Sequence, residues 1–217
     1  MSIKTFSDGE AILFGWKTMK DNLGLFIGIL ITMILVNVLP DIIDKAIEGK
    51  IPGLSIVAYV AFGILNLIIG MGLLKIVLGF CDNEKSRFTE LFSCYRLFFK
   101  YLFSTILYML IVLGGLILFI VPGIIWSIKF QFYPYLIIDK GMGPVEALKA
   151  SALITQGAKW ELVGFGLIIG IISLLGVLCL VIGMFATIPT AWVAYAFVYR
   201  KLLGQTELAQ LKNAIGQ

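Results

Sequence analysis

Long stretches without a charged residue are the feature that most restricts how this chain can fold. Five of them run for fifteen residues or more, and a sixth is interrupted only by Lys129. A helix needs about 20 apolar residues to cross a hydrocarbon layer of about 30 Å. The helices of a soluble bundle would carry a polar outer face, which these stretches lack. The sequence therefore predicts an all-α, polytopic integral membrane protein.

Breaks within the apolar stretches predict how the helices pair. Proline lacks an amide donor and glycine accepts turn conformations, so the Pro122-Gly123 pair and Gly183 predict tight reversals. A longer polar loop separates the first two stretches. We therefore expect six transmembrane helices arranged as three hairpins. The expected spans are residues 23–39, 54–80, 101–121, 124–140, 162–182 and 184–203.

A segment with amphipathic or helix-capping character precedes each expected hairpin. Ser7 and Glu10 form a capping-box pattern at the start of 7–21, which we predict to be an interfacial helix. Aromatic and basic residues alternate at helical spacing through 86–100. A proline suited to a first helical turn begins the third segment, 144–156. We expect three repeats of one unit, a cytoplasmic amphipathic helix followed by a membrane hairpin, within a single domain covering residues 1–217.

The basic residues are distributed unevenly between the two ends of the expected helices. Thirteen of the 17 Lys and Arg residues fall in the N-terminal segment, the connectors between hairpins and the C-terminal segment. The opposite loops hold only Lys45 and Lys50. Because positive charge is enriched on the cytoplasmic side, we expect a multi-pass protein of the bacterial cytoplasmic (inner) membrane with both termini in the cytoplasm.

Basic residues on or beside the connectors are candidates for binding the membrane surface, where positive charge attracts anionic lipids. They are Lys17, Lys20, Arg87, Arg96, Lys100, Lys159, Arg200 and Lys201. The net charge of +4 follows from this bias and does not indicate a nucleic-acid surface. We expect the phospholipid membrane as the partner, with anionic lipid or another membrane protein at this face and no nucleic acid.

Lys129 is the sharpest candidate for function within the apolar stretches. An ionisable residue is costly there, and the stretches contain no Asp or Glu to pair with it. The structural alternative is a lysine that snorkels to the headgroups from near the outer turn. Ser127, Gln131 and Tyr133 lie close in sequence, and Asn66 lies in the middle of another span; each could instead bond a neighbouring helix. Together these residues predict a polar pocket for lipid or ligand.

The sequence offers few groups for catalysis or metal binding. It contains no His and three Cys, and it lacks both a Gly-rich phosphate loop and a pair of carboxylates at span depth. We therefore expect a protein that is not an enzyme and that has no metal site and no cofactor.

Four motifs in the second half of the chain resemble a large group of bacterial membrane proteins. They are Ile120-Val-Pro-Gly-Ile-Ile-Trp126, Tyr133-Pro-Tyr-Leu-Ile-Ile-Asp139, Gly143-Pro-Val-Glu-Ala-Leu-Lys-Ala-Ser151 and Ile154-Thr-Gln-Gly-Ala-Lys-Trp160. That group includes the membrane domain attached to some glycerophosphodiester phosphodiesterases. The resemblance implies six spans and a cytoplasmic-membrane location. It implies no activity, because nothing that follows Leu202 is long enough to be the catalytic domain.

Two functional classes remain open. The first is a non-catalytic membrane protein that engages anionic lipids or a protein partner through basic interfacial helices, with a role in envelope integrity or tolerance to membrane-active agents. The second is a small transporter or channel for a lipid or small solute that uses the polar pocket around Lys129. The basic connectors favour the first class. The scarcity of ionisable residues within the spans weighs against a proton- or ion-coupled carrier.

Overall fold

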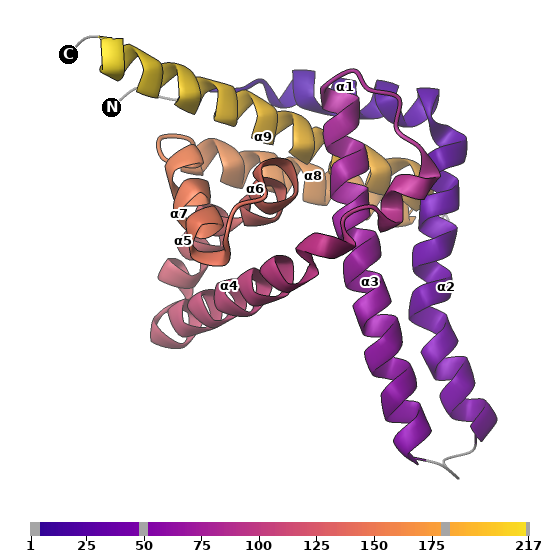
Figure 1. The fold of residues 1–217 in the computed structure, drawn as a ribbon. Coiled ribbons are helices and arrows are strands. Elements are labelled where there is room, and N and C mark those ends of the chain that lie inside the picture. Colours follow the sequence, from indigo (N-terminus) through magenta and orange to yellow (C-terminus); the bar gives the residue numbers. More distant parts are fainter. Residues whose placement is uncertain (1–4, 48–51, 179–182, 216–217) are drawn as a thin grey trace.

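The regular structure of the chain is helical throughout the residues described by the computed structural model, 5–47, 52–178 and 183–215. No strand occurs in these ranges, so the all-α prediction is confirmed (Figure 1). The elements are α1 (Asp8–Asp21), α2 (Leu23–Ile47), α3 (Pro52–Cys81), η1 (Phe88–Phe92), η2 (Tyr95–Leu97), α4 (Phe98–Leu118), α5 (Ile120–Phe130), α6 (Tyr133–Lys140), α7 (Pro144–Ile154), α8 (Lys159–Leu178) and α9 (Met184–Ile215).

Four helical segments among the described residues are long and apolar enough to cross a membrane. They are Leu23–Ile47, Gly53–Cys81, Phe88–Leu118 and Lys159–Leu178. Large apolar side chains are exposed along all four, as at Ile34, Leu110 and Leu174. Such surfaces are unfavourable in water and favourable in lipid. The helices are therefore compatible with a multi-pass membrane protein.

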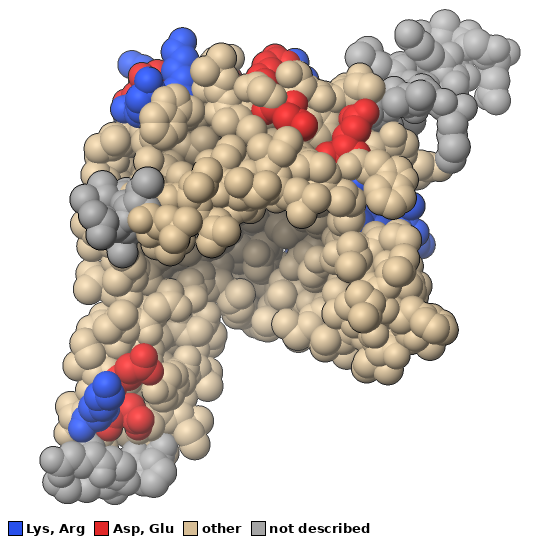
Figure 2. All heavy atoms as spheres, turned by 180° about the vertical axis from the view of Figure 1, so that it is seen from behind, with Lys and Arg blue, Asp and Glu red and all other residues tan. Residues whose placement is uncertain are grey.

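Charged side chains are concentrated at the ends of the molecule. On the face shown in Figure 2, they gather mainly along the end formed by α1 and α9 and at the tip of the arm formed by α2 and α3. The surface between these two ends is hollowed and mostly apolar, with one further group of basic side chains at the right of the view. An apolar band between two charged ends is the distribution expected of a protein that faces lipid.

The arm of α2 and α3 extends farther than the first two predicted spans. Pro40 lies inside α2 rather than at its end, and the helix continues to Ile47, so the expected end of the span at residue 39 is wrong. Proline is tolerated within membrane helices because neighbouring groups and small local adjustments satisfy the backbone that it frees. Asn66 Nδ2 donates to Asn37 Oδ1 at 3.2 Å and joins the two helices of the arm.

α1 packs against the protein along one face instead of resting only on a surface. The serine half of the predicted capping box is present, with Glu10 N donating to Ser7 Oγ at 3.3 Å, whereas the Glu10 carboxylate pairs with Lys201. Ala11, Gly15 and Met19 form the buried face. A Cβ at Gly15 would collide with the backbone of α9, so the glycine allows the two helix backbones to approach closely.

The segment 86–100 does not form the single helix that its spacing predicted. It folds as η1 and η2 before α4 begins at Phe98. Leu91 is fully buried, and its backbone lies so close to Gly72 of α3 that a Cβ on the glycine would collide with it. This close contact with α3 is formed in place of a continuous interfacial helix.

The reversal after α4 comes earlier than predicted. α4 ends at Leu118, Phe119 has extended backbone dihedrals, and α5 begins at Ile120. Pro122 therefore lies in the first turn of α5, where a missing amide donor costs no helical hydrogen bond. The expected span 101–121 is thus shifted toward the N-terminus by three residues, to 98–118.

The predicted span 124–140 is not one helix. It is divided into α5 and α6, which are 11 and 8 residues long. Together they run back along α4. Tyr133 Oη donates to Thr105 Oγ1 at 3.0 Å, and Lys100 Nζ donates to the Gly141 carbonyl at 2.7 Å. The chain thus returns along α4 as an interrupted helix.

α6 packs against α3, α4 and α7. Phe132, Leu136 and Ile137 are fully buried around α6. α7 confirms the helix predicted at 144–156, but it buries one side through Ala147, Leu148, Ser151 and Ile154. The connector that we expected to lie on the cytoplasmic surface of the membrane therefore supplies part of the core.

The last two predicted spans differ in their outcome. α8 ends at Leu178 within the described residues, and the predicted end of its span at 179–182 lies outside them. α9 continues past the expected end at 203 to Ile215. Because Arg200, Lys201 and the polar residues that follow belong to the same helix, α9 is not among the four apolar segments.

Candidate functional site: a lysine groove beside an interrupted helix

An interruption at Gln131 and Phe132 positions the candidate site. Pro134 has no amide hydrogen to donate to Phe130, and the residue before a proline is disfavoured in the α conformation. The helical hydrogen-bond ladder therefore stops between α5 and α6. Backbone groups left without partners at such a break must be satisfied within the protein when it lies in a membrane.

Two hydroxyl side chains of α7 supply the missing partners. Ser151 Oγ accepts from Phe132 N at 3.1 Å and donates to the Lys129 carbonyl at 3.1 Å. Thr155 Oγ1 lies 3.0 Å from the same carbonyl and 3.0 Å from the Ser151 carbonyl of its own helix. Both side chains are fully buried. The backbone of Lys129 is thereby held against α7.

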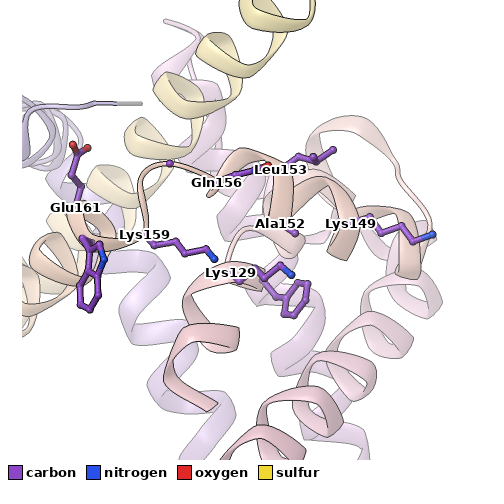
Figure 3. Close-up of a pocket in the computed structure, with 10 residues that line it drawn as sticks. Lys129, Lys149, Ala152, Leu153, Gln156, Lys159 and Glu161 are labelled. Carbon is purple, nitrogen blue, oxygen red and sulfur yellow. The ribbon is translucent and has the colours of Figure 1, made fainter. Parts of the chain in front are cut away.

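Three lysines line one open groove between α5, α7 and α8, with a cavity volume of about 1020 Å³ (Figure 3). They are Lys129, Lys149 and Lys159. Lys159 extends toward Lys129, and Lys149 lies farther along α7. The other lining residues are Phe130, Ala152, Leu153, Gln156, Gly157, Trp160 and Glu161.

No carboxylate in the described part of the chain forms an ion pair with any of these three lysines. Lys129 Nζ lies over the Phe130 ring, 5.1 Å from its centroid. Glu161 points away from the lysine ammonium groups, and its Oε2 is buried without a hydrogen-bond partner. The charged lining residues thus carry a net charge of +2. Lysines arranged in this way suit an anion from outside the chain.

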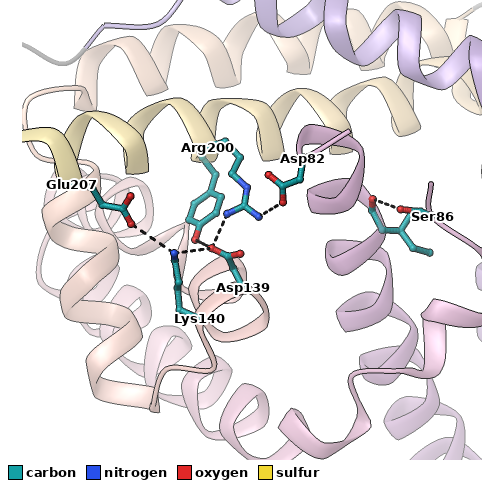
Figure 4. A network of polar contacts seen from close by, with 8 residues as sticks. Asp82, Ser86, Asp139, Lys140, Arg200 and Glu207 are labelled. Carbon is teal, nitrogen blue, oxygen red and sulfur yellow. Dashed lines mark hydrogen bonds and ion pairs between the residues drawn. The ribbon is translucent and has the colours of Figure 1, made fainter. Parts of the chain in front are cut away.

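A second group of charges, which we call the Arg200 cluster, joins α3, α6 and α9 (Figure 4). The Arg200 guanidinium donates to Asp139 at 2.7 Å and to Asp82 at 2.5 Å, and Tyr199 Oη donates to Asp139 at 3.0 Å. Lys140 lies 3.6 Å from Glu207 and 4.0 Å from Asp139. The cluster therefore ties together residues from distant parts of the chain.

The charge of Arg200 is stabilised within this cluster. Burial lowers the pKa of the guanidinium, but the hydrogen bond and charge of Asp139, together with those of Asp82, outweigh burial and raise it. The side chain of Arg200 is 24% exposed and that of Asp139 is 13% exposed. Arg200, which the sequence placed at the membrane surface, is thus engaged by two carboxylates of its own chain.

The other predicted surface cations are distributed over several elements. Lys159 lines the groove, Lys100 bonds the Gly141 carbonyl, and Lys201 Nζ pairs with Glu10 Oε1 at 3.1 Å. The remaining four are exposed: Lys17, Lys20, Arg87 and Arg96. The eight predicted surface cations therefore do not form one basic face, because some contact other residues of the chain and four are exposed.

The polar pocket predicted around Lys129 does not assemble from the residues we expected. Asn66 bonds Asn37 within the arm, and Tyr133 bonds Thr105 of α4. Ser127 Oγ donates to the Ile124 carbonyl of its own helix at 2.8 Å. Gln131 Nε2 is buried at the interruption without a hydrogen-bond partner.

Lys149 was missing from the sequence prediction. The structure places it on the lining of the same groove as Lys129, because α5 and α7 meet at the interruption. Pro134 is the sequence signal for that interruption, since a proline removes one helical hydrogen bond, although α2 continues through Pro40.

Comparison with known proteins identifies two bacterial relatives. An uncharacterised protein of Mycobacterium bovis and one of Mycobacterium tuberculosis are each 27% identical to this chain over 150 residues. The match covers 67% of this chain and 45% of each relative, so the chain spans less than half the length of these curated relatives. No protein-family model matches the chain. No solved structure matches it either.

Proposed function

We propose that this chain is a non-catalytic integral membrane protein that binds anionic phospholipid at the groove of Lys129, Lys149 and Lys159. The observation that carries the proposal is a shared open cavity lined by three lysines that form no ion pair with a described carboxylate. Lysine binds phosphate as a compact positive charge. Trp160, which is 85% exposed at the edge of the groove, has the amphipathic character preferred at the headgroup level.

The proposed setting is the bacterial cytoplasmic membrane, crossed six times by three hairpins with both termini in the cytoplasm. α2 pairs with α3, the interrupted helix of α5 and α6 pairs with α4, and α8 pairs with α9. α1 lies along α9, with Gly15 against Thr190 and Glu10 paired with Lys201. The uneven distribution of basic residues supports the placement of both termini in the cytoplasm. A topology reporter at Lys50 should face outward and one at Gln217 inward; the reverse result would overturn this arrangement.

Lipid retention in native mass spectrometry tests the proposed binding. The full chain is purified in a neutral detergent, stripped of lipid and titrated with phosphatidylglycerol or with phosphatidylcholine of the same acyl chains. We expect selective retention of phosphatidylglycerol. The triple variant Lys129→Met, Lys149→Met, Lys159→Met should weaken that binding by about a hundredfold, because each lysine near an anionic surface contributes about 1 kcal/mol.

Lys85→Met is the matched control for this experiment. Lys85 is exposed, lies outside the groove, and forms no ion pair with a described residue. Its replacement removes one positive charge, as each of the three groove substitutions does, and should leave phosphatidylglycerol retention unchanged. Equal retention of both lipids, or full retention by the triple variant, would falsify the proposal. If a protein copurifies and occupies the groove in place of lipid, the ligand of the groove is a protein partner and not a lipid.

The biological role that we propose is in envelope integrity or tolerance to membrane-active agents. A protein that holds anionic lipid at the cytoplasmic headgroups would influence how the membrane responds to cationic, membrane-active compounds. A strain that carries the triple lysine variant should show the same sensitivity to such compounds as a deletion strain. Wild-type sensitivity in both strains would contradict this role.

A small transporter or channel for lipid or solute is the second candidate function. The interrupted helix favours it, because discontinuous helices form substrate sites in many transporters, and Gln131 Nε2 is buried there without a partner. We rank it below lipid binding because Ser151 and Thr155 already satisfy the interrupted backbone. Movement of a labelled lipid across liposomes, with loss in Lys129→Met, would reverse this order.

A further inference from the structure

We propose that the lysine groove is the headgroup half of a site for one anionic amphiphile, and that an adjoining apolar groove between α5 and α8 holds an acyl chain. This inference rests on the proposed function, because it extends the anion site from the headgroup to the chain. It commits to an acyl chain of an anionic phospholipid as the occupant of the apolar groove.

The apolar groove has a cavity volume of about 340 Å³. Ligand sites in proteins commonly measure about 300 to 1,000 Å³. Lys159 and Trp160 line both this groove and the lysine groove, so the two adjoin. The remaining lining residues are Val121, Ile124, Ile125, Ile128 and Val163.

The wall of the apolar groove follows from the spacing of branched residues on α5. Val121, Ile124 and Ile128 are three and four residues apart, so they share one face of the helix. Val163 of α8 provides the opposite side one turn after Trp160. Branched side chains at Cβ have few rotamers, so little conformational freedom is lost when a chain packs against them.

The change in lining chemistry at Lys159 indicates the polarity of the ligand. On one side lie the ammonium groups of Lys129 and Lys149, and on the other lie five aliphatic side chains. Inorganic phosphate would use only the first side, and an uncharged lipid would use only the second. A ligand that satisfies both carries phosphate at one end and a hydrocarbon chain at the other.

Titration calorimetry of the full chain in neutral detergent separates the two halves of the site. The probes are monoacyl phosphatidylglycerol with a shorter or a longer chain, and glycerol phosphate as the headgroup alone. We expect the wild type to bind the longer-chain lipid most tightly. Val163→Phe fills the apolar groove and should weaken binding of the monoacyl lipid about tenfold, because the phenyl ring occupies the space that the acyl chain would fill. It should leave glycerol phosphate binding unchanged.

Lys129→Met tests the headgroup half independently. It should weaken binding of both probes about fivefold, since it removes one phosphate contact. If Lys129→Met has this effect while Val163→Phe binds the monoacyl lipid like the wild type, the acyl-chain inference is wrong and the proposed function stands. If Lys129→Met changes neither affinity, the proposed function fails as well.

Binding of glycerol phosphate also reports whether Val163→Phe keeps its fold. If that variant loses both probes, Ile125→Ala decides the question, because it widens the groove without filling it. A reduced preference for the longer chain in Ile125→Ala supports the inference. An unchanged preference overturns it, as does wild-type binding of glycerol phosphate as tight as that of the monoacyl lipid.

Discussion

The lysine groove and the Arg200 cluster both contain positively charged side chains, but the two regions differ in whether carboxylates pair with those charges. In the cluster, one guanidinium has two carboxylates of its own chain within 2.7 Å. In the groove, three ammonium groups share a cavity without an ion pair to any described carboxylate. Lys149 and Lys159 of the groove and Arg200 of the cluster all belong to the positive bias of the sequence. The difference shows that charge position along the chain does not separate cations that hold the fold together from cations available to a ligand.

Removing Asp139 should produce the largest effect, because it would leave Arg200 with only the more exposed Asp82. Asp139 accepts hydrogen bonds from Arg200 and Tyr199. We expect Asp139→Ala to lower the free energy of unfolding by about 2 to 3 kcal/mol, less than for a fully buried pair. Reversible unfolding in mixed detergent micelles measures this change.

Asp82→Asn is the comparison for this loss. Asp82 is 42% exposed, so water can partly replace its contact and the cost should be about 1 kcal/mol or less. Phosphatidylglycerol retention should be unchanged in the folded fraction of both variants. Equal and small losses at the two positions would show that the cluster does not hold the fold together.

The hydroxyls that satisfy the interrupted helix should have the next largest effect. Ser151→Ala removes the hydrogen-bond acceptor of Phe132 N in a buried site. It also removes one of the two hydroxyl groups that bond the Lys129 carbonyl. We expect a loss of about 2 kcal/mol in unfolding free energy, together with weaker phosphatidylglycerol retention, because Lys129 would lose its fixed position. Native mass spectrometry and unfolding measurements on the same sample test both effects.

Ser104→Ala is a matched control for that prediction. Ser104 is also fully buried, but its hydroxyl donates to the Lys100 carbonyl within its own helix. That carbonyl retains its helical environment after the replacement, so the cost should be within about 0.5 kcal/mol. A loss as large as that of Ser151→Ala would show that burial of the serine, and not the interruption, determines the effect.

Supplying the groove with a carboxylate should have the smallest effect on stability and a clear effect on binding. Gln156 is exposed and lines the groove. We expect Gln156→Glu to change the unfolding free energy by about 0.5 kcal/mol or less. Phosphatidylglycerol retention should fall about fivefold, as when one positive charge is removed. Gln156→Ala, which adds no charge, should retain the lipid; equal loss in both variants would contradict a charge-based site.

Features that depend on local composition were predicted from the sequence. α3 was expected at 54–80 and lies at Pro52–Cys81, because an apolar stretch forms a helix wherever its backbone must be satisfied internally. The cap at Ser7 involves residues three apart and needs no tertiary contact. The helical character of the chain and its compatibility with a membrane could be predicted for the same reason, because both depend on local composition.

Features that depend on contacts between distant segments were not predicted. Leu91 packs against Gly72, and this contact replaces the helix expected at 86–100. The groove requires α7 to meet the end of α5 through Ser151, and neither hydrophobic periodicity nor charge bias contains that meeting. Arg200 and Asp139 are 61 residues apart in sequence. Their pairing could not be distinguished from two independent surface charges.

Because the helix is interrupted at Gln131, the side chains of α5 and those of α6 can face in directions that are independent of each other. In a continuous helix each residue turns the next by about 100°, so the direction of Ile124 and Ile128 would dictate the direction of Leu136. With the ladder broken, α5 directs its isoleucines toward α8 while α6 buries Leu136 and Ile137 in the centre. A residue inserted into α6 would therefore rotate the core face of the helix that follows it without rotating Lys129.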